Sequence, residues 1–351
     1  SNNTKQDKYY GERYAFLYQG NYNFDLDSSV VFGLEREDDQ MGRDLNAAGT
    51  VNSNAYVTSQ YFDYQRRITN NIYGTFGARF DEHSLAGGTG SNEDSHRATL
   101  AYVFDDKTTK LKSSYGTGYR FPSLFEMKYA YRAGSNTLPF VKAETSQSYD
   151  FGIEKSISPN LFIDLTYFNV KYFNALEGWK SNTAGGTSST QNTIATVKSQ
   201  GIELMSKYKL NEFFNFGLNY TYTSSYDGAD EDNLSGPDSG SQMVRVPRNL
   251  VNLITNIKVP AYKDLDITLR TKWSDKARDY GNGNATSDKS PAFQNETLDS
   301  YLVNDLSLRY NFFNSYNLYF DITNVFDKKY ETALQYSQMD RSYNFGLKKT
   351  Y

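Results

Sequence analysis

The sequence ends in Arg341-Ser-Tyr343-Asn-Phe345-Gly-Leu347-Lys-Lys349-Thr-Tyr351, the most informative segment of the chain. Successive side chains of an extended strand point to opposite faces. The large aromatic and aliphatic side chains that share one face here are Tyr343, Phe345, Leu347 and Tyr351. Small and polar residues occupy most of the other face. A strand that is apolar outside and polar inside is typical of an outer-membrane β-barrel, in which the same alternation must recur along the chain.

The alternation does recur, in fifteen segments with a period of two. In residues 264–274, for example, Leu265, Ile267 and Leu269 oppose Asp266, Thr268 and Arg270. The predicted strands are 12–24, 28–38, 53–66, 70–82, 95–105, 108–118, 145–156, 160–172, 193–209, 213–223, 247–259, 264–274, 301–310, 316–323 and 341–351.

The connections between these strands are alternately short and long. The short turns are 25–27, 67–69, 106–107, 157–159, 210–212, 260–263 and 312–314. The long polar loops are 39–52, 83–94, 119–144, 174–192, 227–246, 278–298 and 324–340. A β-sandwich or a β-solenoid gives no reason for such alternation, whereas outer-membrane barrels have short periplasmic turns and long external loops. The sequence therefore predicts an all-β fold, a transmembrane antiparallel β-barrel.

The number of strands is odd, whereas bacterial single-chain barrels have an even number. An open edge within lipid would leave backbone groups unpaired. We therefore expect residues 1–351 to be a barrel domain that is incomplete at its N-terminus.

Composition agrees with a barrel and excludes other classes. Aromatic residues make up 16% of the 351 residues, yet the mean hydropathy is −0.70. No apolar run is long enough for a helical membrane span. The net charge of −4 gives no reason to expect nucleic acid as a partner. The chain has no cysteine and only two histidines, His83 and His96, which we expect in an external loop, so no catalytic arrangement is visible and we expect no enzyme.

Two segments in the middle of the chain carry further information. Residues 116–126 read Gly-Thr-Gly-Tyr-Arg-Phe-Pro-Ser-Leu-Phe-Glu, and residues 141–152 read Val-Lys-Ala-Glu-Thr-Ser-Gln-Ser-Tyr-Asp-Phe-Gly. This pair resembles the barrel half of TonB-dependent outer-membrane receptors, in which G-x-G-[FY]-R-x-P-S-x-x-E precedes L-K-P-E-x-S-x-x-Y-E-x-G. The chain departs from that pattern at Ala143 and Asp150, where the family usually has proline and glutamate.

Other resemblances follow in the family's order: 201–204, 219–222, 245–247, 324–330 and Arg341, although Met339-Asp340 replaces the usual Pro-Gly before this arginine. Residues 326–332, followed by Tyr336, look most like the vitamin B12 receptors of the family. The residues that carry the family motifs are Gly116, Gly118, Arg120, Pro122, Glu126, Glu144, Asn324, Phe326, Asp327, Tyr330 and Arg341.

The resemblance implies a plugged barrel of about 22 strands, of which about seven, together with the plug, lie outside this chain. Such a receptor sits as a monomer in the outer membrane of a Gram-negative bacterium. It takes up a ferric siderophore, cobalamin or haem, holds no permanent cofactor, and receives energy from the TonB complex through the plug. Barrel-assembly machinery recognises the terminal strand of such a receptor, and in this chain the terminal pattern consists of Tyr343, Phe345, Leu347 and Tyr351.

The motif residues also have a purely physical interpretation. Pro122 lacks an N–H and ends ladder pairing near Phe121. Arg120 has two carboxylates within reach along the sequence, Glu126 and Glu144, and we favour a role in fixing the loop over ligand contact. Asp327 is expected to bond local backbone as an Asx-turn.

Ligand contacts are expected in the external loops, where aromatic and arginine side chains suit a large, planar, often anionic ligand. The candidates are Tyr129, Tyr131, Arg132, Trp179, Arg278 and Tyr280. The alternative, which we favour for most of them, is that they cover neighbouring loops or form the interfacial aromatic belt. Asp227, Asp230 and Asp232 are calcium candidates, since Ca²⁺ prefers clustered oxygen ligands, but we favour a solvated acidic loop at these positions.

Three other classes compete with a receptor. A passive porin of 16–18 strands is the nearest, and the motif series and the odd strand count argue against it. A barrel enzyme such as an outer-membrane lipase lacks its nucleophile–histidine arrangement. A soluble β-rich adhesin would lack the lipid-facing stripe.

Overall fold

A computed structural model describes residues 8–44, 50–85, 90–124, 126, 141–181, 188–192, 196–228, 242–280, 295–313 and 315–349. Within these ranges, no helix is long and apolar enough to cross a membrane.

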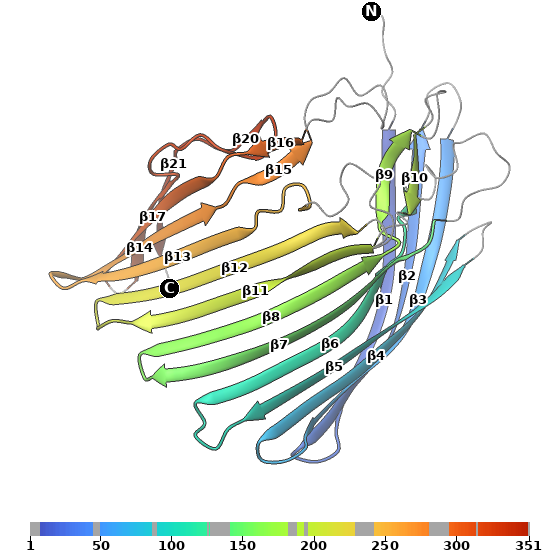
Figure 1. The fold of residues 1–351 in the computed structure, drawn as a ribbon, viewed down its shortest axis with the longest axis horizontal. Helices are drawn as coiled ribbons and strands as arrows, with labels where there is room; N and C mark the ends of the chain where they lie inside the picture. The colour runs from blue at the N-terminus through green and yellow to red at the C-terminus, as the bar shows by residue number, and fades with distance from the viewer. Residues whose placement is uncertain are drawn as a thin grey trace, which may run out of the picture.

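Fifteen strands form one antiparallel sheet in which every strand pairs with the next one along it (Figure 1). The strands are β1 (Lys8–Asn23), β2 (Ser28–Asp44), β3 (Thr50–Arg67), β4 (Ile72–Leu85), β5 (Ser91–Val103), β6 (Thr109–Arg120), β7 (Glu144–Ser158), β8 (Leu161–Phe173), β11 (Thr196–Lys209), β12 (Phe214–Gly228), β13 (Asn249–Val259), β14 (Tyr262–Ser274), β17 (Tyr301–Phe312), β18 (Tyr316–Thr323) and β21 (Ser342–Lys349). The predicted fold class is confirmed. The sheet curls strongly, with β1 and β21 at its two margins.

The ladder register keeps like side chains on one face of the sheet. Between β14 and β17, Leu269 lies opposite Leu306, and the next pair is Arg270 with Asp305. We call the face with Leu269 the outer face and the face with Arg270 the inner face. On β21, Phe345 is 78% exposed on the outer face, although it is a large apolar side chain. Such exposure along a whole sheet face marks a surface that meets lipid.

The inner face of β1–β8 carries ion pairs, some within one strand and some between strands. Arg13 Nε lies 2.6 Å from Asp39 Oδ1, and Arg79 Nε lies 3.0 Å from Asp81 Oδ2. Lys112 Nζ lies 2.6 Å from Asp164 Oδ2. Charges that face a polar lumen are therefore neutralised within the wall on this side of the sheet.

Three small hairpins, which the sequence did not reveal, stand in the long connections. They are β9 (Leu176–Ser181) with β10 (Ser188–Asn192), β15 (Ala277–Tyr280) with β16 (Asn295–Leu298), and β19 (Glu331–Ala333) with β20 (Tyr336–Ser337). Their residues are mostly polar on both faces, so they carry no period-two signal.

Two predicted loops turned out to be largely strand. β2 and β3 stay paired up to Asp44, and β4 and β5 up to His83. The predicted loops 39–52 and 83–94 are thus mostly extensions of hairpins, and His83 and His96 lie on strands rather than in a loop. Beyond the lipid a strand can have water on both faces, so the ladder continues where the alternation of apolar side chains has ended.

Candidate functional site

Strand β6 delivers Arg120 to the end of the sheet where the long connections lie. Gly116, Gly118 and Arg120 follow one another on the inner face, opposite Ser148, Ser146 and Glu144 of β7. A Cβ on Gly118 would come within 3.0 Å of Ser146 Oγ, so the two strands approach closely below the arginine. The ladder stops at Arg120, two residues before Pro122, as the missing N–H of proline requires.

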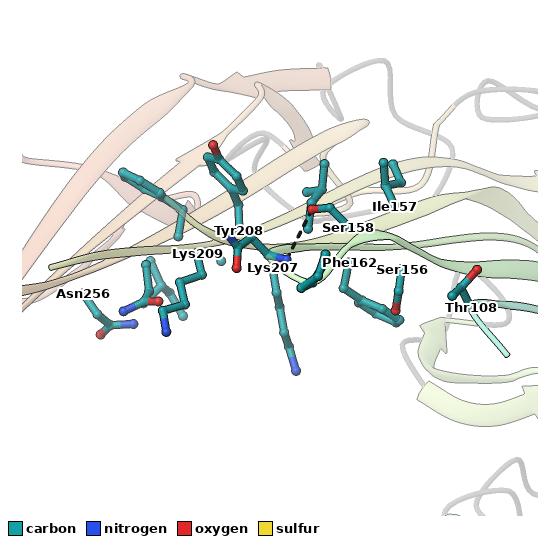
Figure 2. A pocket seen from close by; sticks show the side chains of 16 residues that line it. Thr108, Ser156, Ile157, Ser158, Phe162, Lys207, Tyr208, Lys209 and Asn256 are labelled. Carbon is teal, nitrogen blue, oxygen red and sulfur yellow. Dashed lines mark hydrogen bonds between the residues drawn. The ribbon is translucent and has the colours of Figure 1, made fainter. Parts of the chain in front are cut away.

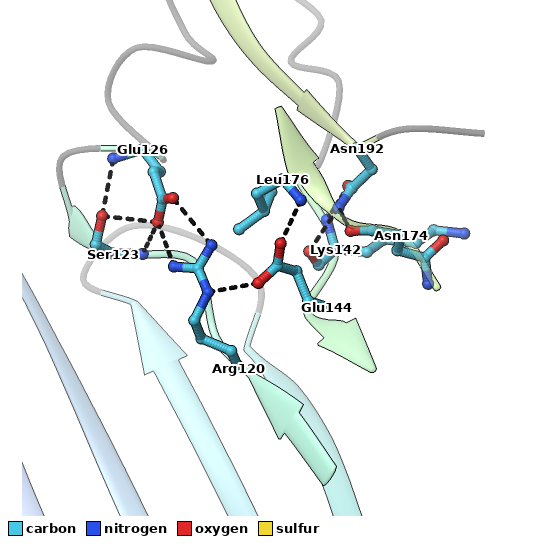
Figure 3. Close-up of polar contacts among 8 residues, drawn as sticks. All are labelled: Arg120, Ser123, Glu126, Lys142, Glu144, Asn174, Leu176 and Asn192. Atoms are coloured by element: carbon cyan, nitrogen blue, oxygen red, sulfur yellow. Dashed lines mark hydrogen bonds and ion pairs between the residues drawn. The ribbon is translucent and has the colours of Figure 1, made fainter. Parts of the chain in front are cut away.

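Arg120 is held between two carboxylates (Figure 3). Its Nε donates to Glu144 Oε2 at 2.5 Å. Its Nη1 and Nη2 donate to the two carboxylate oxygens of Glu126, at 2.9 and 3.1 Å. This fork geometry is the strong, charge-assisted form of the arginine–carboxylate pair. We call Arg120, Ser123, Glu126 and Glu144 the arginine cluster.

The two carboxylates of the arginine cluster also accept hydrogen bonds from other residues. Glu126 Oε2 accepts bonds from the N–H and the hydroxyl of Ser123, both at 2.8 Å. Glu144 Oε1 accepts from the N–H of Leu176, the first residue of β9, at 2.5 Å. The side-chain amide of Asn192, in β10, makes two hydrogen bonds to the backbone of Lys142. Its Oδ1 accepts from the N–H of Lys142, and its Nδ2 donates to the carbonyl oxygen of Lys142. The start of the connection after β6, the start of β7 and the β9–β10 hairpin are therefore fastened together.

The electrostatics of the arginine cluster favour the ionised form of Glu126. Partial burial alone would raise the pKa of Glu126, but hydrogen bonds from Arg120 and Ser123 outweigh it and lower that pKa below its ordinary value. All three charged groups are engaged with one another. The geometry thus serves to fix the loop.

A second group of motif residues closes the connection between β18 and β21. Asn324 is only 2% exposed and adopts a positive φ of 54°. Its Oδ1 accepts from the N–H of Lys328 at 2.8 Å, and its Nδ2 donates to Lys328 O at 2.9 Å and to Met339 O at 3.3 Å. Its own N–H donates to Asp305 Oδ1 on β17 at 2.8 Å. We call this group, with Asp327 and Arg341, the asparagine cluster.

Asp327 does not form the local Asx-turn expected from the sequence. Its Oδ1 accepts instead from the N–H of Arg341, fourteen residues further on, at 2.8 Å. This bond lowers the pKa of Asp327. The reason for the difference is that Asn324 already provides the local turn, which leaves Asp327 to bridge the two ends of the connection. Tyr330 packs on Tyr301, with ring centroids 4.4 Å apart, whereas Phe326 is 75% exposed.

A third fastening point, Asp279, was not predicted by any motif or spacing in the sequence. This carboxylate on β15 is fully buried. It accepts from Arg245 Nε at 2.9 Å and from the N–H of Leu334, in the β19–β20 hairpin, at 2.6 Å. Its neighbour Arg278 donates to Gln242 O at 2.8 Å. Asp279 and its partners thereby join three long connections. Asp279 was not a candidate in the sequence, although it is adjacent to the candidate Arg278.

Arg278 is the one ligand candidate whose side chain lies within the described part of the chain. Arg278 is engaged in the contact just described. Trp179 and Tyr280 lie on β9 and β15, and only their backbone is described. The remaining candidates, Tyr129, Tyr131 and Arg132, and the calcium candidates Asp230 and Asp232 lie outside the described residues, as does Tyr351, while only the backbone of Asp227 is described. Their roles stay predictions.

An antiparallel sheet with a lipid-compatible outer face, a charged inner face and its long connections fastened at one end is the wall of an outer-membrane β-barrel. The family can also be stated. The chain belongs to the family described as "TonB dependent receptor-like, beta-barrel", whose model matches residues 1–325. The protein is therefore an outer-membrane protein of Gram-negative bacteria.

Individual relatives agree with this family. The vitamin B12 transporter BtuB of Vibrio cholerae serotype O1 is 24% identical over 269 residues, which cover 77% of this chain and 38% of the transporter. The ferripyoverdine receptor of Pseudomonas aeruginosa is 19% identical with a TM-score of 0.71, covering 98% of this chain and 49% of that receptor. The iron transporter FrpB of Neisseria meningitidis is 15% identical with a TM-score of 0.76, covering 97% and 55%.

The chain therefore spans between about two fifths and a little over half of the length of these relatives. The relatives are transporters and receptors rather than enzymes, in agreement with the expectation from the sequence.

Proposed function

We propose that the complete protein is a receptor that takes up a scarce, large ligand across the outer membrane with energy from the TonB complex. The observation that carries this proposal is the match with the ferripyoverdine receptor, which includes 98% of this chain but only 49% of the receptor. On this proposal, the fifteen strands form part of a longer receptor wall. A passive porin is the second candidate.

The whole receptor would contain about seven further strands and a plug in the lumen, through which the TonB complex acts. The two strand margins, β1 and β21, would then be covered by the added strands. Such a receptor needs no permanent cofactor and would work as a monomer. Its barrel-assembly signal would be the terminal pattern of Tyr343, Phe345, Leu347 and Tyr351.

The proposed ligand is cobalamin, a ferric siderophore or haem. Sequence similarity to BtuB, a vitamin B12 transporter, supports testing cobalamin first. The three fastening points hold the external connections in fixed positions, which suits a preorganised binding surface. The proposed contacts are the aromatic and arginine residues of these connections: Tyr129, Tyr131, Arg132, Trp179, Arg278 and Tyr280.

The test is binding and uptake by the full-length receptor. Cells that carry it should bind cobalamin, a ferric siderophore or haem saturably, and accumulation should stop when TonB is deleted while binding persists. Trp179→Ala should weaken binding, and Tyr310→Ala, on the outer face of β17, is the matched control on lipid-facing wall. Linear, non-saturable uptake that is unchanged without TonB would support the porin instead.

A further inference from the structure

Two lysines lie directly opposite each other on the outer face of the sheet, at the end where the long connections lie. Lys171 of β8 and Lys198 of β11 form one pair of the antiparallel ladder. Both lie an even number of residues from the ladder pair Leu165 and Leu204, and the register places that pair on the same face as Leu269. Both lysines are therefore outer-face residues.

Figure 2 shows the same sidedness further along β11, near its short turn. Tyr208 and Lys207 are neighbours in the sequence and extend to opposite sides of the sheet. The register places Tyr208 opposite Phe216 on the outer face, and Lys207 opposite Gly217 on the inner face. Because Lys198 lies an even number of residues before Tyr208, it shares the outer face with this tyrosine.

Below the lysine pair, the outer face changes step by step from polar to apolar. Moving along this ladder toward the middle of the sheet, the next outer-face pairs are Asn169 with Gln200, Tyr167 with Ile202, and Leu165 with Leu204. Leu165 and Ile202 are 42% and 43% exposed, as expected of side chains that meet lipid. This order follows the depth of a lipid leaflet, in which tyrosine gathers at the interface above the acyl chains. The lysine pair therefore lies at the level of the headgroups.

The neighbours of the lysine pair in the ladder do not balance its charge. Like charges directly opposite each other on adjacent strands are destabilising. On either side, Lys171 faces Gln147 of β7 and Lys198 faces Tyr226 of β12, and both of these partners are uncharged. Among the residues that the structure describes, the ammonium group of Lys171 takes part in no ion pair or hydrogen bond. An anion between the two strands would replace repulsion by attraction to both lysines.

A second lysine on the same face shows that this arrangement is particular to the pair. Lys155 of β7 lies at the short-turn end of the outer face, opposite Ile163. Its Nζ lies 3.0 Å from Asp106 Oδ2 and donates to Thr109 Oγ1 at 2.6 Å. The wall itself thus neutralises the outer-face lysine at the short turns, whereas the ladder around Lys171 supplies no carboxylate.

The amide of Gln200, next to the lysine pair, adds hydrogen-bond donors. Its Oε1 accepts from Tyr167 OH at 3.3 Å and from Asn169 Nδ2 at 3.2 Å. Its Nε2 donates to no group in the described ranges of the chain. Two ammonium groups and an amide N–H group therefore lie together above the lipid-facing tyrosine.

We propose that Lys171 and Lys198 together bind a phosphate of a phosphorylated glycolipid in the outer leaflet of the outer membrane. The long connections of such barrels are external, so the lysine pair meets the outer leaflet. Paired positive charge at headgroup level selects the phosphate, and the exposed Leu165 and Ile202 below it contact the acyl chains of the same lipid. This inference goes beyond the proposed uptake function and depends only on the location of the sheet in the membrane.

Lipid binding to the full-length receptor tests this proposal. Delipidated receptor in neutral detergent micelles is titrated with lipid A, and bound lipid is counted by native mass spectrometry. In the double variant Lys171→Gln, Lys198→Gln, we expect the half-saturating concentration of lipid A to rise about fivefold for each lysine removed. Lipid A whose phosphates have been removed should bind the receptor and the double variant equally. Lys171→Arg with Lys198→Arg keeps both charges and should keep the preference for phosphorylated lipid A.

Lys155→Gln is the matched control, because it removes a lysine from the same face at the opposite end of the sheet and should leave lipid A binding unchanged. Migration on unheated gels checks that each variant is folded. Equal binding of phosphorylated lipid A by the receptor and by the folded Lys171→Gln, Lys198→Gln variant would overturn the proposal. Displacement of lipid A by inorganic phosphate at the same concentration would overturn it as well, because the site would then bind a free anion and not a lipid headgroup.

Discussion

The arginine cluster and the asparagine cluster both close a long external connection, but they do so with different chemistry. Arg120 is half exposed and gathers two carboxylates around one cation. Asn324 is buried and satisfies backbone N–H and C=O groups with one neutral amide. The first depends on charge and therefore on pH, whereas the second depends on burial. Two motif segments of one family thus hold the rim by two physical mechanisms.

The largest effect is expected from a change in the wall that carries both clusters. Leu269→Arg places a charge on the outer face of β14, and near the bilayer midplane it should cost about 2–4 kcal/mol. Urea unfolding of the full-length receptor in lipid vesicles measures this. Thr268→Arg, on the inner face one residue away, is the control and should cost much less. Equal costs at the two positions would contradict the assignment of the faces.

Within the asparagine cluster, Asn324→Ala should lower the free energy of unfolding by about 2–3 kcal/mol. The substitution leaves the partly buried N–H of Lys328 without its acceptor and places alanine at a positive φ. The control is Asn317→Ala, which removes an exposed bond to Asn311 and should cost less than about 0.5 kcal/mol. If both variants unfold at the same urea concentration, burial does not decide the strength of this cluster.

The arginine cluster should respond less strongly to loss of its central residue. Arg120→Gln removes a charge-assisted fork, but the group is half exposed, so we expect a cost of about 1–2 kcal/mol. Arg36→Gln, which removes an exposed pair with Asp38, is the matched control and should cost about 0–1 kcal/mol. A cost for Arg120→Gln above that of Asn324→Ala would reverse the comparison between the two clusters.

The smallest effect, and the most specific, concerns pH. The pKa of Glu126 is lowered, so its contribution to stability is present above the ordinary carboxyl pKa and is lost as pH falls through the lowered value. Hydrogen exchange at the Ser123 amide, corrected for the intrinsic rate, should therefore quicken as the pH falls below the ordinary carboxyl pKa of about 4.5. The Lys328 amide, bonded to Asn324, is the neutral reference and should change less. In Glu126→Gln the difference between the two amides should disappear.

Much of the fold followed from the sequence, because a strand between lipid and a polar lumen must alternate at every second residue. The order of the strands followed as well, since short turns force consecutive strands to pair. Strand ends were less predictable, as β2 and β4 show: above the lipid their alternation stops while their hydrogen bonds continue. The sequence pattern likewise did not predict the hairpins β9–β10, β15–β16 and β19–β20, because their residues do not alternate between apolar and polar.

For the site, the sequence identified Arg120, Glu126 and Glu144 as potential partners, because Glu126 follows Arg120 in the same motif and Glu144 opens the motif at the start of the next strand. It could not identify Asp279, whose partners Arg245 and Leu334 are 34 and 55 residues away. It also assigned Asp327 to a local turn, although its partner is Arg341. Contacts between separate connections depend on how the strand ends are arranged in space, and sequence spacing carries little of that information.

The alternation of side chains along each strand is enough to specify a membrane-spanning sheet with an apolar outer face, because the face on which a side chain lies is a local property of the strand. Which charges are neutralised depends instead on the arrangement of the strands in space. The register brings Lys112 next to Asp164 but leaves Lys207, Lys209 and Lys258 without an ionic partner in the described wall. The physical reason is that an ion pair depends on distances of a few ångströms across strands, and these are fixed by the ladder register and the curl of the sheet.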